Sequence, residues 1–363
     1  MDIRTAHPNR PVNSHLRRAS VAVAITVLAL TGAIVAHATP PGMNGRIAFE
    51  RLRFQNSPLW GELFVANSDG TDVRRITHPP NGTEDGFPDW SVDGSQIIFT
   101  RQPPKGASSI WSVAPDGSRL RRLSPYCPPG TGIPTCPADD WGAVWSPDLK
   151  HIVFQRISGT TRPKGASVGD ATAIYSIALV IADANLRHPR TLVWFGPFRG
   201  SPQFSSWSPD GKQIAFIEHN DNGTRMKPVG GRALYVVNAN GAGLRRLTPW
   251  ALTAGDRIDW SPDGSTILFR THPGDDVTGL GANLYTIHPD GTGLHQLTHF
   301  APHVRVGMGS YSPDGKSITF PTSAGAVGPG LPDVYIMNAD GTDLRQLTKT
   351  RNFEASPDWG PAS

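Results

Sequence analysis

The sequence predicts an all-β fold, a six-bladed β-propeller built from four-stranded antiparallel blades. The first observation is a repeat, Trp-Ser-Pro-Asp-Gly followed by an Ile-x-Phe strand, which returns about every fifty residues. The second is a hairpin signature, an apolar run ending in Asn-x-Asp-Gly or Asn-x-Asn-Gly, which alternates with the first. The third is composition: 39 Gly and 34 Pro suit many turns, and 38% hydrophobic residues exclude a disordered chain.

The first half of the repeat supplies two strands joined by a tight turn. In that turn, Pro fixes one φ angle, and Asp is able to bond the backbone that follows. One four-stranded blade per repeat accounts for the spacing. The copies lie at 90–99, 145–154, 207–216, 260–269 and, with Tyr in place of Trp, 311–320.

The second half of the repeat supplies a hairpin. Asp-Gly or Asn-Gly between two apolar runs provides the positive φ angles that a tight hairpin turn requires. Each repeat is therefore strand, tight turn, strand, longer loop, strand, tight turn, strand. The clearest hairpins lie at 63–70, 234–241 and 334–341, and each continues into Arg-Arg-Ile-Thr, Arg-Arg-Leu-Thr or a close variant.

The two ends of the chain are predicted to share the first blade. Six Ile-x-Phe strands occur, and the first, at 47–49, has no Trp-Ser-Pro-Asp-Gly ahead of it. Residues 357–360 match 88–91, so the C-terminal strand is expected to join the N-terminal blade and close the ring. Blades two to six are then expected near 87–124, 141–193, 203–248, 256–298 and 306–348.

The third copy of the repeat predicts an irregular blade. Leu149 stands where the other copies have the turn Gly. The apolar run 175–181 leads into Asn185-Leu186-Arg187 without an Asp-Gly. The local turn chemistry must therefore differ in this blade.

These paired motifs resemble the WD-like propeller repeats in the C-terminal domain of TolB, the periplasmic component of the Tol-Pal system. The resemblance rests on six recurrences and covers nearly the whole chain after residue 38. It implies a propeller outside the cytoplasm, without the α/β domain that precedes the propeller in TolB. Similar repeats form the propeller of prolyl-oligopeptidase-like peptidases, whose hydrolase domain is not expected here.

The N-terminal segment predicts export. Arg17 and Arg18 precede an uncharged, mostly apolar run at 19–36, and Ala36-His37-Ala38 forms a small-x-small cleavage site. Residues 1–38 are therefore expected to be a signal peptide, which leaves a single propeller domain at 39–363. The alternative is an uncleaved anchor, since a run of this length just spans a bilayer. The expected location is periplasmic, cell-wall-associated or extracellular, with membrane contact only through an uncleaved anchor.

The charge balance argues against a nucleic-acid partner. Residues 1–38 hold four Arg and one Asp, so their removal lowers the formal charge from +4 to +1. Nucleic-acid binding normally leaves a strongly basic footprint, which this balance lacks.

Two cysteines, Cys127 and Cys136, lie in one Pro-rich loop and are expected to form a disulfide in an exported protein. A metal pair is the alternative, but no second pair or His set accompanies it at zinc-site spacing. Neither a metal nor another cofactor is predicted.

Two further patterns carry chemistry elsewhere but not in this context. Residues 165–169, Gly-Ala-Ser-Val-Gly, match the nucleophile-elbow pattern, which works only on a strand-to-helix turn. His295, His299 and His303 have a spacing that makes a metal face on a helix, yet His295 occupies the strand position of Arg245 in a sister repeat. No catalytic residue is predicted.

The topology predicts two different faces. The tight turns fall at one end of each blade, and loops of variable length fall at the other, at 51–59, 101–108, 155–172, 217–232, 270–282 and 321–332. Insertions on one face of a repeat protein usually mark its binding face. The charged residues expected to line the channel mouth there are Asp89, Asp140, Arg257, Arg305 and Glu354, with ordinary solvated charges as the alternative.

The leading hypothesis is a non-enzymatic binding or scaffold protein that holds a protein segment or cell-envelope ligand on its loop face and channel mouth. The alternative is a propeller enzyme, a glycan lyase or hydrolase or a cofactor-dependent oxidoreductase, with its site in the central channel. A third is a structural remnant whose hydrolase partner is a separate chain.

Overall fold

The computed structural model describes residues 42–53, 60–125, 139–161, 174–195, 201–219, 231–271, 281–325 and 331–362. These residues form β-strands joined by turns, with one short 3-10 helix, η1 (Trp250–Leu252), and all belong to the unit Val35–Ser363. No helix in these ranges has the length and apolar character needed to span a bilayer. The prediction of an all-β fold is confirmed.

The strands assemble into antiparallel groups of four that follow one another along the chain. Group 1 contains β24 (Phe353–Pro361), β1 (Asn44–Arg53), β2 (Trp60–Ala66) and β3 (Arg74–Arg75). Group 2 contains β4 (Glu84–Trp90), β5 (Ile97–Gln102), β6 (Ser109–Val113) and β7 (Arg121–Arg122). A single parallel pair between Gly61 and Glu84 joins these two groups into one eight-stranded sheet.

The remaining groups are separate four-stranded sheets. Group 3 contains β8 (Asp139–Trp145), β9 (His151–Thr161), β10 (Ile174–Asp183) and β11 (Arg190–Val193). Group 4 contains β12 (Ser201–Trp207), β13 (Gln213–His219), β14 (Arg232–Asn238) and β15 (Arg245–Arg246). Group 5 contains β16 (Ala254–Trp260), β17 (Ile267–Thr271), β18 (Leu284–Ile287) and β19 (His295–Gln296), and group 6 contains β20 (Ser310–Tyr311), β21 (Ser317–Thr322), β22 (Asp333–Asn338) and β23 (Arg345–Gln346).

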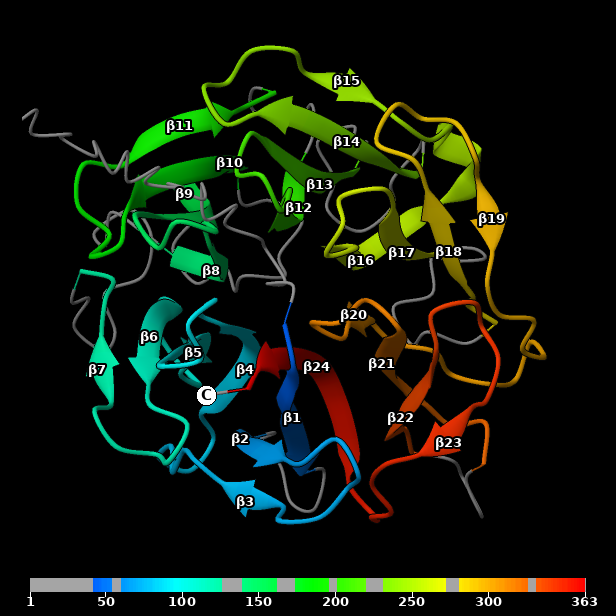
Figure 1. Cartoon of the computed structure of the whole chain (residues 1–363). Helices are drawn as coiled ribbons and strands as arrows, with labels where there is room; N and C mark the ends of the chain where they lie inside the picture. Colours follow the sequence, from blue (N-terminus) through cyan, green and yellow to red (C-terminus); the bar gives the residue numbers. More distant parts are fainter. Residues whose placement is uncertain are drawn as a thin grey trace, which may run out of the picture. The chain divides into compact units, whose positions relative to one another are not determined.

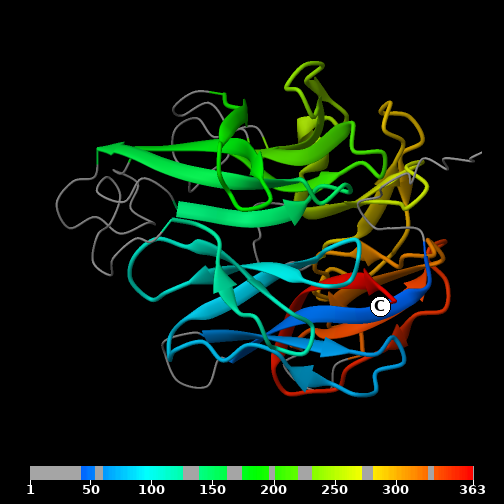
Figure 2. The same ribbon diagram turned by 60° about the vertical axis from the view of Figure 1, so that its left-hand side comes forward.

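The C-terminal strand lies beside the N-terminal one. Strand β24 pairs antiparallel with β1, with Trp359 opposite Ile47 and Glu354 opposite Arg51. Figures 1 and 2 both show these two strands side by side. Strand β24 also contacts β20, β21 and β22 of group 6 on one side and β4 of group 2 on the other.

The core consists of apolar layers between successive groups. The Phe of each Ile-x-Phe strand is completely or almost completely buried, because it packs against the preceding group, or against group 6 in the case of Phe49, rather than against solvent. One cluster, for example, joins Phe49 of β1 and Trp359 of β24 to Ile336 of β22. The buried Phe side chains are Phe49, Phe99, Phe154, Phe216, Phe269 and Phe320.

The repeated Asp residues serve the tight turns, as predicted. Asp93 accepts hydrogen bonds from the Ser91 hydroxyl at 2.6 Å and from the Ser95 backbone N–H at 3.0 Å. The Ser91 hydroxyl oxygen accepts in turn from the Gln96 N–H at 2.9 Å. Gly94 supplies the left-handed backbone, with φ of 68°.

Group 3 is irregular, as predicted. Leu149 adopts φ of 58° where the other copies have Gly, and β10 shifts register against β11 between Leu179 and Val180. Asp183 replaces the missing Asp-Gly chemistry, because its carboxylate accepts from the backbone N–H groups of Asn185 and Arg187.

The first strand of each group carries an irregularity that matters for the site. Strands β4, β8, β12, β16, β20 and β24 contact one another in succession and lie toward the middle in Figure 1. Most contain a bulge two to five residues before their aromatic residue. At this bulge the backbone is left-handed in Phe87, Gly142, Phe204 and Ser356, with φ of 50° to 56°.

Candidate functional site

In four of the six first strands, the residue just before the aromatic residue ties two groups together. Asp89 accepts a hydrogen bond from the Trp145 N–H of group 3 at 2.9 Å. Asp358 accepts from the Trp90 N–H of group 2 at 2.7 Å. Two further bonds are of the same kind. Asp259 accepts from the Tyr311 N–H at 2.8 Å, and the Ser310 hydroxyl oxygen accepts from the Trp359 N–H at 3.2 Å.

Arg257 of β16 gathers these carboxylates into a central cluster. Its Nη2 lies 2.8 Å from Asp358 Oδ1 and 3.2 Å from Asp89 Oδ1. Its Nη1 donates to the Pro88 carbonyl at 2.6 Å. The guanidinium side chain is only 9% exposed, so it depends on these partners in place of water. We call Asp89, Arg257, Asp259 and Asp358 the central cluster.

The central cluster has three carboxyl groups and one guanidinium group, and the pKa values of Asp89, Asp259 and Arg257 are all raised. Burial, followed by the charge of Asp358, raises the pKa of Asp89 well above its usual range, although Arg257 opposes the shift. The same two causes raise the pKa of Asp259 to about 7. Burial lowers the pKa of Arg257, but the carboxylates of Asp358 and Asp89 outweigh it and leave that pKa raised. The cluster therefore holds protons at neutral pH that an exposed Asp would release.

A second set of polar contacts, which we call clasps, lies near the other end of the first strands. Each joins two strands of one group, and some also reach a neighbouring group. Asp85 bonds Arg101 at 2.6 and 2.7 Å, and Asp140 bonds Arg156 at 2.8 and 3.1 Å, each across a strand pair. The Ser124 hydroxyl of the preceding group donates to Asp140 at 3.0 Å. These bonds satisfy carboxylates that are fully buried.

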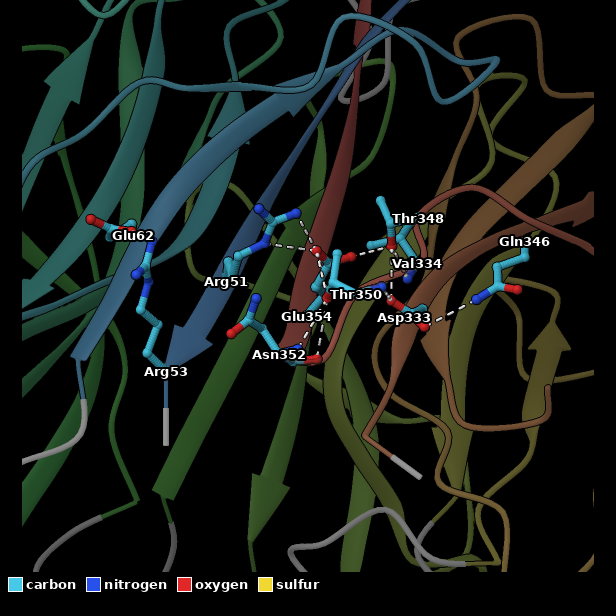
Figure 3. Close-up of polar contacts among 10 residues, drawn as sticks. All are labelled: Arg51, Arg53, Glu62, Asp333, Val334, Gln346, Thr348, Thr350, Asn352 and Glu354. Carbon is cyan, nitrogen blue, oxygen red and sulfur yellow. Dashed lines mark hydrogen bonds and ion pairs between the residues drawn. The ribbon is translucent and has the colours of Figure 1, made fainter. Parts of the chain in front are cut away.

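Figure 3 shows the corresponding clasp between groups 6 and 1. The Glu354 carboxylate accepts from Arg51 Nε at 2.8 Å and from the Thr348 hydroxyl. The Arg51 guanidinium also lies 4.1 Å from the ring centre of Phe64. Burial raises the pKa of Glu354, while Arg51 and Thr348 oppose that rise. Asp333 continues the network, because it accepts from the Thr350 N–H at 2.8 Å.

An aromatic pocket lies where β4, β8 and β12 meet. The ring of Phe87 lies 6.0 Å from that of Trp141 and 6.1 Å from that of Phe204, with tilts of 56° and 42°. All three side chains are half-buried. They border a cavity of about 80 Å³, which we call the aromatic pocket. The residues that line it are Phe87, Trp141, Gly142, Gln155, Ile157, Ile177, Gln203 and Phe204.

Hydrogen bonds from the surrounding groups hold the walls of the aromatic pocket. Asp139 accepts from the Trp141 indole N–H at 2.8 Å and from the Ser108 N–H at 2.8 Å, which fixes the indole plane. The Gly142 N–H donates to the Thr100 hydroxyl at 3.0 Å. The left-handed backbone of Phe87 and Phe204 costs about 1–3 kcal/mol each, and such strain clusters at functional sites.

The charged residues predicted at the channel mouth lie in three different environments. Asp89 and Arg257 come together in the central cluster. Asp140 and Glu354 are fully buried in separate clasps. The backbone of Arg305 bonds the Ser323 side chain at 2.9 Å. Binding by these residues stays a prediction.

The other predicted features divide between described and undescribed segments. His295 lies on strand β19 as expected, and His299 and His303 are exposed beyond it. In the described ranges, no group of three His, Cys, Asp or Glu is arranged to hold a metal ion. Cys127, Cys136 and the Gly-rich segment 165–169 lie outside the described residues.

The sequence prediction missed several residues of the central site. Asp259 and Asp358 were visible as Asp directly before Trp, the same context as Asp89. The aromatic residues Phe87, Trp141 and Phe204 carried no such signal, because their convergence depends on the bulges. A search of the sequence for Asp directly before Trp would have found Asp259 and Asp358.

The comparisons with known proteins point to one fold. No family model matches the chain. An uncharacterized protein of Agrobacterium fabrum is 26% identical over 158 residues, 44% of this chain, so the chain matches about half (47%) of that relative's length. TolB from Acinetobacter baumannii shares the fold with a TM-score of 0.62, at 18% identity over 87% of this chain and 67% of that one.

Further solved structures share the architecture. A putative TolB from Agrobacterium tumefaciens has a TM-score of 0.55 at 17% identity, covering 88% of this chain and 99% of its own. Two oligogalacturonate lyases, one in complex with manganese and one from Vibrio parahaemolyticus, have TM-scores of 0.50 at 14% and 13% identity, with 80% of this chain and 72% of theirs covered. The chain therefore has a TolB-like β-propeller fold.

Proposed function

We propose that the chain is an exported, non-enzymatic binding protein, which holds a protein segment or cell-envelope ligand at the loop face of a closed, six-bladed propeller. The observation that carries the proposal is the aromatic pocket, where three half-buried aromatic side chains meet and two of them, Phe87 and Phe204, lie on left-handed backbone. Concave sites lined by partly exposed aromatic side chains are typical of binding sites.

Contacts between the ends of the chain support the closed six-bladed arrangement. Strand β24 pairs with β1, and the bond from the Trp90 N–H to Asp358 ties group 1 to group 2. On the other side, Ser310 of group 6 bonds the Trp359 N–H. Each group would then be one blade, with its first strand innermost.

The N-terminal segment and the TolB resemblance support export. In an exported protein, a disulfide between Cys127 and Cys136 is part of the proposal. We expect the protein recovered from the cell envelope to begin at Thr39, by N-terminal sequencing, and to contain no free thiol. Protein that begins at Met1 and remains in the cytoplasm would overturn the export proposal.

The binding role is tested by capture from cell-envelope extract. Trp141→Ala opens the aromatic pocket, so we expect it to reduce the captured material at least about tenfold. Leu244→Ala removes an exposed apolar side chain of the turn side and serves as the matched control. Equal capture by wild type and Trp141→Ala, with both folded by circular dichroism, would contradict the role of the pocket.

A propeller enzyme is the second candidate. A carboxyl with a pKa of about 7, such as Asp259, suits general acid–base chemistry at neutral pH. Asp89 and Arg257 would then orient a substrate in the channel. Elemental analysis and an absorption spectrum of the purified protein test this reading, since a stoichiometric metal or chromophore favours an enzyme over a binding protein.

A further inference from the structure

The aromatic pocket contains two polar side chains that its apolar walls leave without partners. Gln155 is only 6% exposed, and Gln203 is half-buried. In the described part of the chain, no hydrogen bond engages either side-chain amide, and both line the pocket. Both amides border the cavity, so they are available to a ligand inside it and indicate which groups the pocket can receive.

The position of the Gln155 amide is fixed by the strand pairing. Gln155 lies opposite Trp141 in the register between β9 and β8. Its Nε2 lies so close to Gly142 that a Cβ at that position would approach it to 3.3 Å. Gly142 also has φ of 56°, so glycine both permits the backbone and keeps the space in front of the amide open.

The chemistry of the lining restricts the ligand. None of the lining residues carries an ionisable side chain, which disfavours a charged group inside the pocket. An amide both donates and accepts, and a hydroxyl group does the same, so the two amides match a hydroxylated ligand. The three tilted aromatic faces match the apolar face of a ring.

The size of the cavity indicates a single ring. About 80 Å³ is the volume of roughly three water molecules at about 30 Å³ each, so the cavity has room for part of one ring and not for two. The hydrogen bonds of Asp139 to Trp141 and of Arg257 to the Pro88 carbonyl, next to Phe87, hold the walls in place before the ligand arrives.

We propose that the aromatic pocket binds one uncharged sugar unit of a glycan, with Phe87, Trp141 and Phe204 against the ring and the amides of Gln155 and Gln203 on its hydroxyl groups. This inference rests on the proposed binding function and names the ligand of the central pocket. Asp139 is a positioning residue, because it acts through the Trp141 indole.

The test measures binding of three uncharged oligosaccharides, tri-N-acetylchitotriose, cellotriose and maltotriose, to the full chain by isothermal titration calorimetry. A trimer of galacturonic acid serves as the charged comparison, and the tripeptide Gly-Tyr-Gly as the peptide comparison. We expect at least one uncharged sugar to bind, and Gln155→Leu to weaken it at least about tenfold. Gln213→Leu, a change of the same kind on β13 outside the pocket, should leave the affinity unchanged.

Leucine has nearly the volume of glutamine, so Gln155→Leu should keep the melting temperature of the wild type. Binding of the tyrosine peptide alone, with the same dependence on Gln155, would overturn the sugar assignment and leave the binding function intact. Absence of sugar binding up to about 10 mM would also overturn the assignment. If the wild-type protein captures nothing from cell-envelope extract, the proposed binding function itself would be overturned.

Discussion

Two sets of aspartates, four residues apart in the same repeat, have opposite environments. Asp93 and Asp263 lie in tight turns, where burial opposes ionisation but hydrogen bonds from neighbouring Ser side chains and N–H groups outweigh it and lower the pKa. Asp89 and Asp259 lie on the first strands, where burial and Asp358 raise the pKa. The turn aspartates thus build the turn, while the aspartates of the central cluster have raised pKa values.

The largest effect is expected at Arg257, the only cation among the central carboxylates in the described residues. Arg257→Met removes that charge and leaves the acids without a partner, so we expect a loss of about 3–5 kcal/mol in the free energy of unfolding at pH 7. Urea denaturation measures this loss, with Arg245→Met on strand β15, outside the central cluster, as the control. A loss below about 1 kcal/mol would show that the carboxylates are neutralised by other means.

Removing one partner of a clasp should cost less. Glu354→Ala leaves Arg51 and Thr348 without their acceptor, but Arg51 is 14% exposed and regains some water, so we expect a loss of about 1.5–3 kcal/mol. Thermal unfolding checks this value. Glu354→Gln keeps one acceptor oxygen and should recover part of the loss, whereas equal losses for both variants would argue against the clasp.

Asp259 predicts a dependence of stability on pH. Its pKa is about 7 in the folded chain and near 3.8 in the unfolded chain, so the folded state binds the proton more tightly. Stability from this group is therefore present below about pH 4 and is lost as pH rises toward 7, by about 2 kcal/mol between pH 5 and 7. Asp259→Asn should remove that component from denaturation curves recorded at both pH values. An unchanged pH slope would rule out the raised pKa.

The smallest effect is expected in the turns. Asp93→Ala removes bonds to Ser91 and Ser95, but water can reach these groups, so we expect a loss of about 0.5–1.5 kcal/mol. The same denaturation assay, with Asp314→Ala as a second copy, measures it. If Asp93→Ala lost as much free energy of unfolding as Arg257→Met, the proposed difference between the turn aspartates and the central cluster would be contradicted.

The sequence allowed the repeat, the turns and the pairing of β24 with β1 to be predicted, because each depends on local signals such as Asp-Gly or on similarity between 357–360 and 88–91. The site was predictable only in part. The pairing of Arg257 with Asp89 and Asp358 joins residues far apart in the chain, which no local pattern encodes. The partner of Asp140 depends on strand register, which places Arg156 directly across.

The aromatic pocket was not predictable for a related reason. Phe87 and Phe204 look like ordinary strand residues, and alternation alone does not reveal which face they occupy. The bulge between Gly86 and Asp89, and the one between Gln203 and Ser206, change that alternation. A bulge arises from packing among the groups, which is a tertiary property.

The most direct test of the contrast between centre and turns is hydrogen–deuterium exchange of the chain with and without captured envelope material. We expect protection to increase in peptides from β4, β8 and β12, which carry the aromatic pocket. The turns at 91–96 and 208–213 should exchange at unchanged rates. Protection confined to those turns, with none in the three first strands, would contradict the assignment of binding to the centre.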